Sequence, residues 1–316
     1  MTGKSRQNQS LIWVYPPDSW YTTSNKTFVY GYADPNKKLF VSSDEYLVPE
    51  RIKIFPNGNF ARSIKLPDLT NNIKLIQMIN GKRKILTRTV ITRNKVTKQS
   101  QATTSLRGAK RQSNLSNVMR LPRAFSPRND IVIVIDPGHG GSEHGTHSPK
   151  GIPEKIFNLQ IAKLLYRNLS RVILQYDPTC HVYMTRTTDK FVSLKQRVLF
   201  AKKKKCNILI SIHHNALPDS EDPLKHSGIG IYHTHDFVKP LAKTLLDSIS
   251  KEAYLKRYGI FKRDFVMTRV TFCYAVLIEC GFLIHPVESE YITKPETQKK
   301  IVNGIIKGLK ASRLLK

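Results

Sequence analysis

Three apolar stretches of this sequence are each followed by a residue that can bind a metal or carry a proton: His139, His213 and Glu279. A fourth such residue, Glu154, comes directly after Pro153 in the first turn of an expected helix. Two imidazoles and one carboxylate are the protein ligands of a common type of catalytic zinc site, which leaves one position for water. A separate carboxylate can then accept a proton from that water.

Each of these residues also has a structural interpretation when it is considered alone. A single histidine after a strand is more often a hydrogen-bonded core or turn residue than a ligand. Glu154 by itself fits a charge that is favoured by the helix dipole, and Glu279 by itself fits a structural carboxylate. The occurrence of all four at the ends of expected strands or helices favours one shared site.

The elements that would position these residues alternate between strand and helix from residue 130 onward. Buried strands are expected at residues 131–135, 181–185, 207–212, 230–233 and 274–278. Helices are expected after Pro153, after the capping-box-like Ser193, and at residues 238–255 and 298–309. The pattern predicts an α/β fold over residues 130–316, three-layer-like, with a twisted, mostly parallel sheet flanked by helices. If the strands before His139, His213 and Glu279 are parallel neighbours, the three side chains meet at one sheet edge.

The N-terminal part, residues 1–92, has a different pattern. Seven short β-rich pieces are separated by turn signals such as Pro-Asn-Gly-Asn and Asn-Gly-Lys. This spacing predicts an all-β domain, and we expect an immunoglobulin-like sandwich. Because the region has no cluster of His, Asp or Glu, we interpret it as an accessory module for binding or a spacer.

Residues 93–129 contain basic and small polar residues and no acidic residue, which predicts a flexible basic linker. The whole chain has 52 Lys and Arg against 23 Asp and Glu, a formal net charge of +29. Such an excess suggests a polyanionic partner: nucleic acid, an anionic wall polymer or a membrane surface. A solvated basic surface with no such partner is the alternative.

The four cysteines lie far apart and form no C-x-x-C pair, which argues against a zinc–thiolate site. Cys206 and Cys273 adjoin apolar runs and are expected to be buried free thiols. No apolar run approaches the roughly 20 residues of a transmembrane helix. The apolar block at residues 11–15 is too short for the core of a signal peptide, so no export signal is recognisable.

Residues 131–312 resemble the zinc-dependent N-acetylmuramoyl-L-alanine amidases of the amidase-3 type, which cut peptidoglycan. The resemblance rests on five motifs that occur in the family's order. They are I-D-P-G-H-G-G at 135–141, G-I-P-E-K at 151–155, T-R-T-T-D at 185–189 with Leu194 and Arg197, S-I-H-H-N-A at 211–216 and V-L-I-E-C-G-F-L at 276–283.

The resemblance implies one zinc ion held by His139, Glu154 and His213, with Glu279 as the catalytic acid and base. It implies a substrate role for Asn215 and Arg186. His214 stands where the family often has a small residue, and we expect it to support the metal ligands or to be structural. Five other histidines, at 144, 147, 226, 233 and 235, match no ligand position and are expected in loops or at the surface.

The implied reaction is hydrolysis of the amide between N-acetylmuramic acid and L-alanine of the stem peptide, in the cell envelope. Peptidoglycan is then the partner, and anionic wall polymers are candidates for the basic linker. The alternatives are a non-catalytic wall-binding relative and a basic nucleic-acid-binding protein. The nucleic-acid alternative is disfavoured because no recognition helix or aromatic RNA-binding strand accompanies the basic residues.

Overall fold

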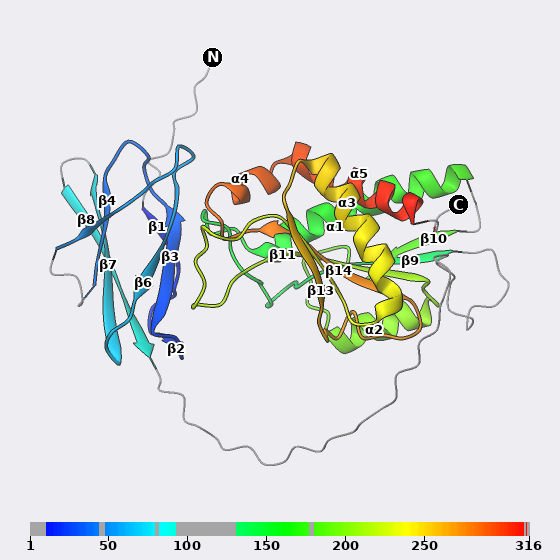
Figure 1. Ribbon diagram of the computed structural model, residues 1–316, viewed down its shortest axis with the longest axis horizontal. Helices are drawn as coiled ribbons and strands as arrows, with labels where there is room; N and C mark the ends of the chain where they lie inside the picture. The colour runs from blue at the N-terminus through cyan, green and yellow to red at the C-terminus, as the bar shows by residue number, and fades with distance from the viewer. Residues whose placement is uncertain are drawn as a thin grey trace, which may run out of the picture.

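The computed structural model of the chain describes residues 11–43, 48–79, 82–92, 131–176, 180–312 and 314. These residues form a β-rich unit, which we call the β-module (the described residues between 11 and 92), and an α/β unit (the described residues from 131 onward). Figure 1 shows the two units side by side. The expected linker at 93–129 lies outside the described residues.

Two sheets make up the β-module. Its strands are β1 (Ile12–Tyr15), β2 (Trp20–Thr22), β3 (Lys26–Tyr32), β4 (Leu39–Ser42), β5 (Glu50–Ile52), β6 (Asn59–Lys65), β7 (Thr70–Ile79) and β8 (Lys82–Thr92). One sheet has the order β1-β3-β6 and the other β2-β8-β7-β4-β5. Alternate residues of both sheets, including Trp13, Val29, Leu39 and Leu75, share one buried apolar cluster, so the sheets pack face to face.

The α/β unit is built on one six-stranded sheet. Its strands are β9 (Val132–Pro137), β10 (His181–Met184), β11 (Ile208–Asn215), β12 (Ile229–His233), β13 (Arg257–Lys262) and β14 (Tyr274–Phe282). Their order is β10-β9-β11-β14-β12-β13, and every neighbouring pair is parallel except β12 with β14. The expected mostly parallel sheet is therefore confirmed.

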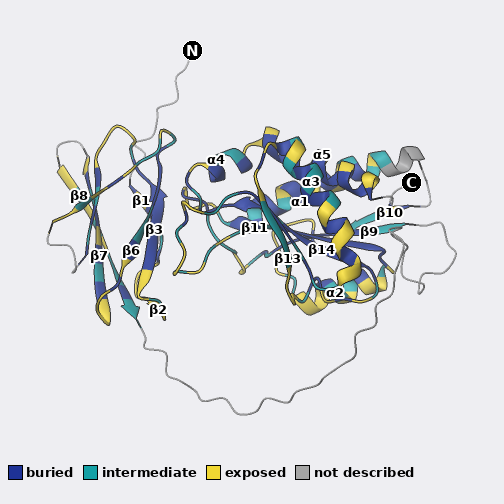
Figure 2. Cartoon of the chain, viewed as in Figure 1, coloured by how far each residue is buried: buried dark blue, intermediate teal, exposed yellow. Residues whose placement is uncertain are grey.

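Helices cover both faces of this sheet (Figure 1). They are α1 (Glu154–Tyr176), α2 (Leu194–Lys203), α3 (Lys239–Ala253), α4 (Glu288–Ile292) and α5 (Pro295–Ala311), with a 3₁₀ turn η1 (Asp236–Val238) before α3. α1, α3 and α5 share the larger core with the sheet, whereas Ala201 of α2 belongs to a smaller cluster on the opposite face. Figure 2 shows the buried strands between these layers.

The elements expected from the sequence are largely present. α2 begins with the expected capping box, in which Ser193 and Gln196 bond each other's backbone. β2, β13 and α4 were not predicted, since they are short or lack a clear apolar period. The immunoglobulin-like topology of the β-module is not confirmed, although the module is all-β as expected. All four cysteines are buried thiols. No helix of the described residues is long and apolar enough to span a membrane.

Candidate functional site

The three apolar strands that precede the candidate residues are neighbours at the centre of the sheet. β11 lies between β9 and β14 and is parallel to both. His213 of β11 is in register with Glu279 of β14, so the two side chains project from the same face of adjacent strands, roughly 4.8 Å apart along the sheet. His139 follows β9 at the same edge. The sheet therefore brings these three residues together, as the sequence predicts.

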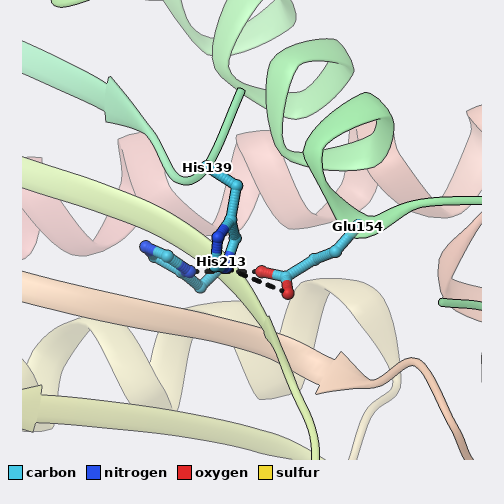
Figure 3. A group of neighbouring side chains, drawn as sticks. All are labelled: His139, Glu154 and His213. Carbon is cyan, nitrogen blue, oxygen red and sulfur yellow. Dashed lines mark hydrogen bonds and ion pairs between the residues drawn. The ribbon is translucent and has the colours of Figure 1, made fainter. Parts of the chain in front are cut away.

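Glu154 joins them from the first turn of α1, and its carboxylate is turned toward both imidazoles (Figure 3). Its Oε2 is 3.3 Å from His139 Nε2, and its Oε1 is 3.1 Å from His213 Nδ1. One ligand atom from each of the three residues lies within 4.8 Å of the others. Glu154 is buried, while the imidazoles are partly open to solvent. Such a group can hold one divalent ion and leave a side open for water or substrate.

The backbone of the loop after β9 is shaped to present His139. His139 has φ +57°, a left-handed conformation that is uncommon for a residue other than glycine. Gly138, just before it, lies against the His213 ring, because a Cβ on Gly138 would be 2.2 Å from His213 Nε2. Close contact between this backbone and the second imidazole therefore requires glycine at 138.

A buried ion pair fixes the start of the His139 loop, where β9 ends. Arg197 of α2 and Asp136 of β9 are 2 % and 1 % exposed, and Arg197 Nη1 lies 2.8 Å from Asp136 Oδ1. Arg197 also donates hydrogen bonds to the backbone oxygens of Pro137 (2.6 Å) and His139 (2.7 Å). Asp136 accepts a further bond from Ser211 Oγ. The guanidinium thus ties the end of β9 and the start of the His139 loop to α2.

Arg186 does not lie where the sequence analysis expected it. Its side chain is 1 % exposed and donates to the backbone oxygens of Pro137 (3.0 Å), Gly138 (2.8 Å) and Lys155 (3.1 Å). A guanidinium that is buried and bonded in this way cannot reach a substrate, so the expectation of a substrate contact is wrong. Burial, with Arg197 nearby, lowers the pKa of Arg186 to about 10. Its role is to hold the loop next to α1.

Three groups orient the Glu154 carboxylate. Asn158, one turn further along α1, donates to Glu154 Oε1 at 2.9 Å. The backbone N–H of His214 donates to the same oxygen at 3.0 Å, and that of Thr146 donates to Oε2 at 3.1 Å. Asn158 Oδ1 also lies 2.8 Å from His214 Nδ1, which fixes this buried imidazole behind the site. Hydrogen bonds of this kind orient metal ligands in many proteins.

Glu279 is half-buried beside the group, and its Oε2 has no hydrogen-bond partner among the described residues. Burial and the negative charge of Glu154 raise the pKa of Glu279 well above its usual value. Burial, and then the charge of Glu279, raise the pKa of Tyr232 to about 12, and Tyr232 is also linked to Asn215 by a side-chain hydrogen bond. An unsatisfied carboxyl oxygen with a raised pKa is typical of a group that exchanges protons with a ligand.

Glu154, His139 and His214 have perturbed pKa values with clear causes. Burial opposes ionisation of Glu154, but its hydrogen bonds to His139 and His213 outweigh burial and hold its pKa well below the usual value. Burial also opposes charging of His139, but the hydrogen bond and charge of Glu154 outweigh it and raise the pKa of His139. Burial lowers the pKa of His214 to about 4, so this histidine is neutral near pH 7.

The sequence analysis missed the roles of the residues that support the site. Arg197 was noted only as part of a motif, with no role given to it. Asn158 was not noted, although the spacing of four between Glu154 and Asn158 on one helix face was available. Of the other histidines, His233 is 2 % exposed at the end of β12, so the expectation of a loop or surface position is wrong for it. Its ring bonds the backbone oxygen of His235.

Residues 133–311 match the family described as N-acetylmuramoyl-L-alanine amidase (Amidase_3). A protein of Staphylococcus epidermidis named "Probable cell wall amidase LytH" is 34% identical over 187 residues, which is 58% of this chain. The chain spans 59% of the length of that relative. The solved N-acetylmuramoyl-L-alanine amidase of Clostridium difficile 630 is 34% identical, with a TM-score of 0.53 over 58% of this chain and 97% of that structure. The catalytic domain of CwlV from Bacillus (Paenibacillus) polymyxa var. colistinus is 29% identical, with a TM-score of 0.52 over 59% and 99%.

Proposed function

The chain belongs to the N-acetylmuramoyl-L-alanine amidase (Amidase_3) family, and from that premise we propose that it cleaves the amide between N-acetylmuramic acid and L-alanine in peptidoglycan. We further propose that one zinc ion is held by His139, Glu154 and His213, and that Glu279 is the catalytic acid and base. The observation that carries the proposal is the convergence of three ligand atoms within 4.8 Å beside a carboxyl group with an unsatisfied oxygen.

The donor set fits zinc. Two imidazole nitrogens and one carboxylate are ligands that zinc accepts in catalytic sites. Glu154 is held in place by neighbouring donors, and His139 is set by its backbone, so the ligands need little rearrangement. Zinc bound there supplies Lewis-acid chemistry, which lowers the pKa of a water and polarises the substrate carbonyl.

The residues of this chain perform the proton transfers. Glu279 is in register with His213, and its Oε2, which has no hydrogen-bond partner among the described residues, can accept a proton from the attacking water. Glu279 then gives that proton to the alanine nitrogen as this leaves. Asn215, which lies at the end of β11 and is hydrogen-bonded to Tyr232, is the residue that we propose for a substrate contact. No serine or cysteine nucleophile is required.

The test is digestion of purified sacculi by the full chain, with mass spectrometry of the released material. We expect free stem peptides from the wild type, none after treatment with a chelator, and recovery when zinc is returned. Glu279→Gln keeps the shape of the side chain but cannot accept the proton, so it should retain zinc and lose turnover by about 100-fold or more. Glu296→Gln, on the exposed first turn of α5, is the matched control.

Substantial turnover by Glu279→Gln would show that the acid and base role is misassigned. Release of sugars with no stem peptides would refute the amidase assignment itself. Zinc content that is unchanged when His139 and His213 are both replaced by alanine would refute the ligand set.

We also propose that the protein acts at the cell envelope on peptidoglycan, as the names of its relatives indicate for those proteins. The net charge of +29 supports retention on anionic wall polymers. Such retention must weaken as salt screens the charges. Sedimentation with sacculi at rising salt tests this, and binding that does not depend on salt would count against it.

A further inference from the structure

The β-module contacts the α/β unit at the loops next to the candidate site. The sheet with β1, β3 and β6 is the one that faces the α/β unit (Figure 1). Its contacts reach the loop before α1, the loop after β11 and the loop after β14. These are the loops that adjoin Glu154, His213 and Glu279 respectively.

Asp219, in the loop after β11, is one anchor of this contact. Its carboxylate accepts hydrogen bonds from the side chains of three residues of the β-module: Tyr15, Trp20 (3.1 Å) and Thr27 (3.0 Å). The donors come from three different strands or strand ends, so one carboxylate ties the fold of the module to this loop. Hydrogen bonds to a charged acceptor are among the stronger ones in proteins.

A second anchor lies after β14. The backbone oxygen of Pro286 accepts from the side-chain amides of Asn57 (2.9 Å) and Asn59 (2.8 Å). Ile284, two residues earlier, is 1 % exposed and packs in an apolar cluster with Phe28 and Tyr30 of β3. Because Ile284 is covered by residues of the β-module, the contact is an apolar interface as well as a polar one.

The third contact leads directly to the metal-binding group. Tyr30 is 3 % exposed, and its hydroxyl donates to the backbone oxygen of His147 at 3.0 Å. The preceding residue, Thr146, bonds Glu154 twice: its N–H donates to the carboxylate at 3.1 Å, and its oxygen accepts from the Glu154 N–H at 2.8 Å. Two hydrogen-bonded steps therefore link Tyr30 of the β-module to Glu154.

We propose that the β-module is a working part of the site, in which Tyr30 is a positioning residue that holds the Thr146–His147 backbone and, through it, the Glu154 carboxylate. This inference rests on the proposed function, since it assigns the module a role in metal binding. The module thus differs from a tethered wall-binding domain, which would leave the metal site unchanged when its contact is broken.

The first test compares two tyrosine-to-phenylalanine changes in the full chain. Tyr30→Phe removes the hydroxyl that bonds His147, and Tyr291→Phe removes a hydroxyl that donates to the backbone oxygen of Ala253 at 2.9 Å, away from the site. Both changes delete the same kind of bond. We expect zinc, measured by competition with a chelating dye, to bind about 2- to 10-fold more weakly to Tyr30→Phe alone.

A second readout separates positioning from a general loss of structure. If Tyr30 acts through Glu154, saturating zinc should restore the amidase rate of Tyr30→Phe nearly to that of the wild type. A loss of rate that excess zinc does not correct, or equal zinc affinity in both variants and the wild type, would overturn the proposal.

The second test releases the module at its other anchor. Asp219→Ala leaves Tyr15, Trp20 and Thr27 without their shared acceptor, and Trp20 is one of only two tryptophans in the chain. The other, Trp13, bonds within the module. We expect a red shift of the tryptophan emission together with weaker zinc binding. A red shift with unchanged zinc affinity would overturn the proposal, whereas a wild type without zinc or amidase activity would refute the proposed function first.

Discussion

Replacement of Gly138 by alanine should disable the metal site without removing any ligand. A Cβ built at this position lies 2.2 Å from both Cε1 and Nε2 of the His213 ring, where ordinary carbon contacts begin at about 3.5 Å. The ring or the loop must therefore move by more than about 1 Å. The His139 loop is held by Arg197 and Arg186, so we expect the His213 ring to give way.

A displacement of this size is large enough to lower both the rate and the zinc affinity. Misplacement by about 1 Å can cost roughly 100-fold in rate, and altered support of a metal ligand commonly costs 10- to 100-fold in affinity. We expect Gly138→Ala to lose at least about 100-fold in kcat/KM on muropeptides and at least about 10-fold in zinc affinity. Both are measured on the folded protein, with thermal unfolding followed by circular dichroism.

Gly304→Ala is the matched control. A Cβ at Gly304 of α5 would lie 2.5 Å from Ile249 Cα of α3, so this change also forces a close contact, but between two helices away from the site. It should lower the melting temperature while zinc affinity stays within about twofold of the wild type. If Gly138→Ala binds zinc as tightly as Gly304→Ala does, the close approach of His213 to the loop has no bearing on the metal site.

Three further predictions follow from the buried groups around the site. Asn158→Ala removes a donor to Glu154 and should weaken zinc binding about 10- to 100-fold in the dye competition assay; an unchanged affinity would show that Glu154 is held by other groups. Arg197→Met leaves the Asp136 charge buried and unpaired, so urea unfolding should show a loss of about 3–5 kcal/mol, and a loss below 1 kcal/mol would contradict this. Burial raises the pKa of Glu288 in the folded protein to about 7, above its usual 4.5. The stability that its protonated form contributes is therefore fully present below about pH 4.5, and it is lost as the pH rises through 7. Measured with chelator present, the stability of Glu288→Gln relative to the wild type should therefore rise by up to about 3 kcal/mol between pH 4.5 and 8, and a difference that does not change with pH would refute the assignment.

The sequence predicts the arrangement of the sheet and its site because local patterns determine both. β9, β11 and β14 are runs of apolar residues that can only be buried at the sheet centre, and parallel strands end at a common edge. His139, His213 and Glu279 therefore had to converge once the strands were neighbours. The helix start at Glu154 was equally local, since an acidic residue is favoured in the first turn of a helix and Pro153 directly precedes it.

The remaining features depend on contacts between distant segments. Nothing near Arg186 in the sequence indicates that its guanidinium bonds backbone oxygens of the loop after β9, so a motif arginine was interpreted as a substrate contact. Asp219 lies in a polar loop with no recognisable pattern, and its three donors come from residues about 200 positions earlier. β13 alternates weakly and was not recognised, because its inner positions are only half-buried.

The left-handed backbone of His139 indicates a trade-off between stability and catalysis. For a residue with a Cβ, this left-handed conformation costs roughly 1 kcal/mol or more, whereas glycine adopts it freely. A chain selected only to fold would therefore place glycine there, as it does at the two positions that follow, Gly140 and Gly141. Glycine at 139 should thus give a protein with a higher free energy of unfolding than alanine at 139, although neither residue has an imidazole. The fold retains a locally unfavourable residue at this turn, and only the chemistry of that side chain accounts for its presence.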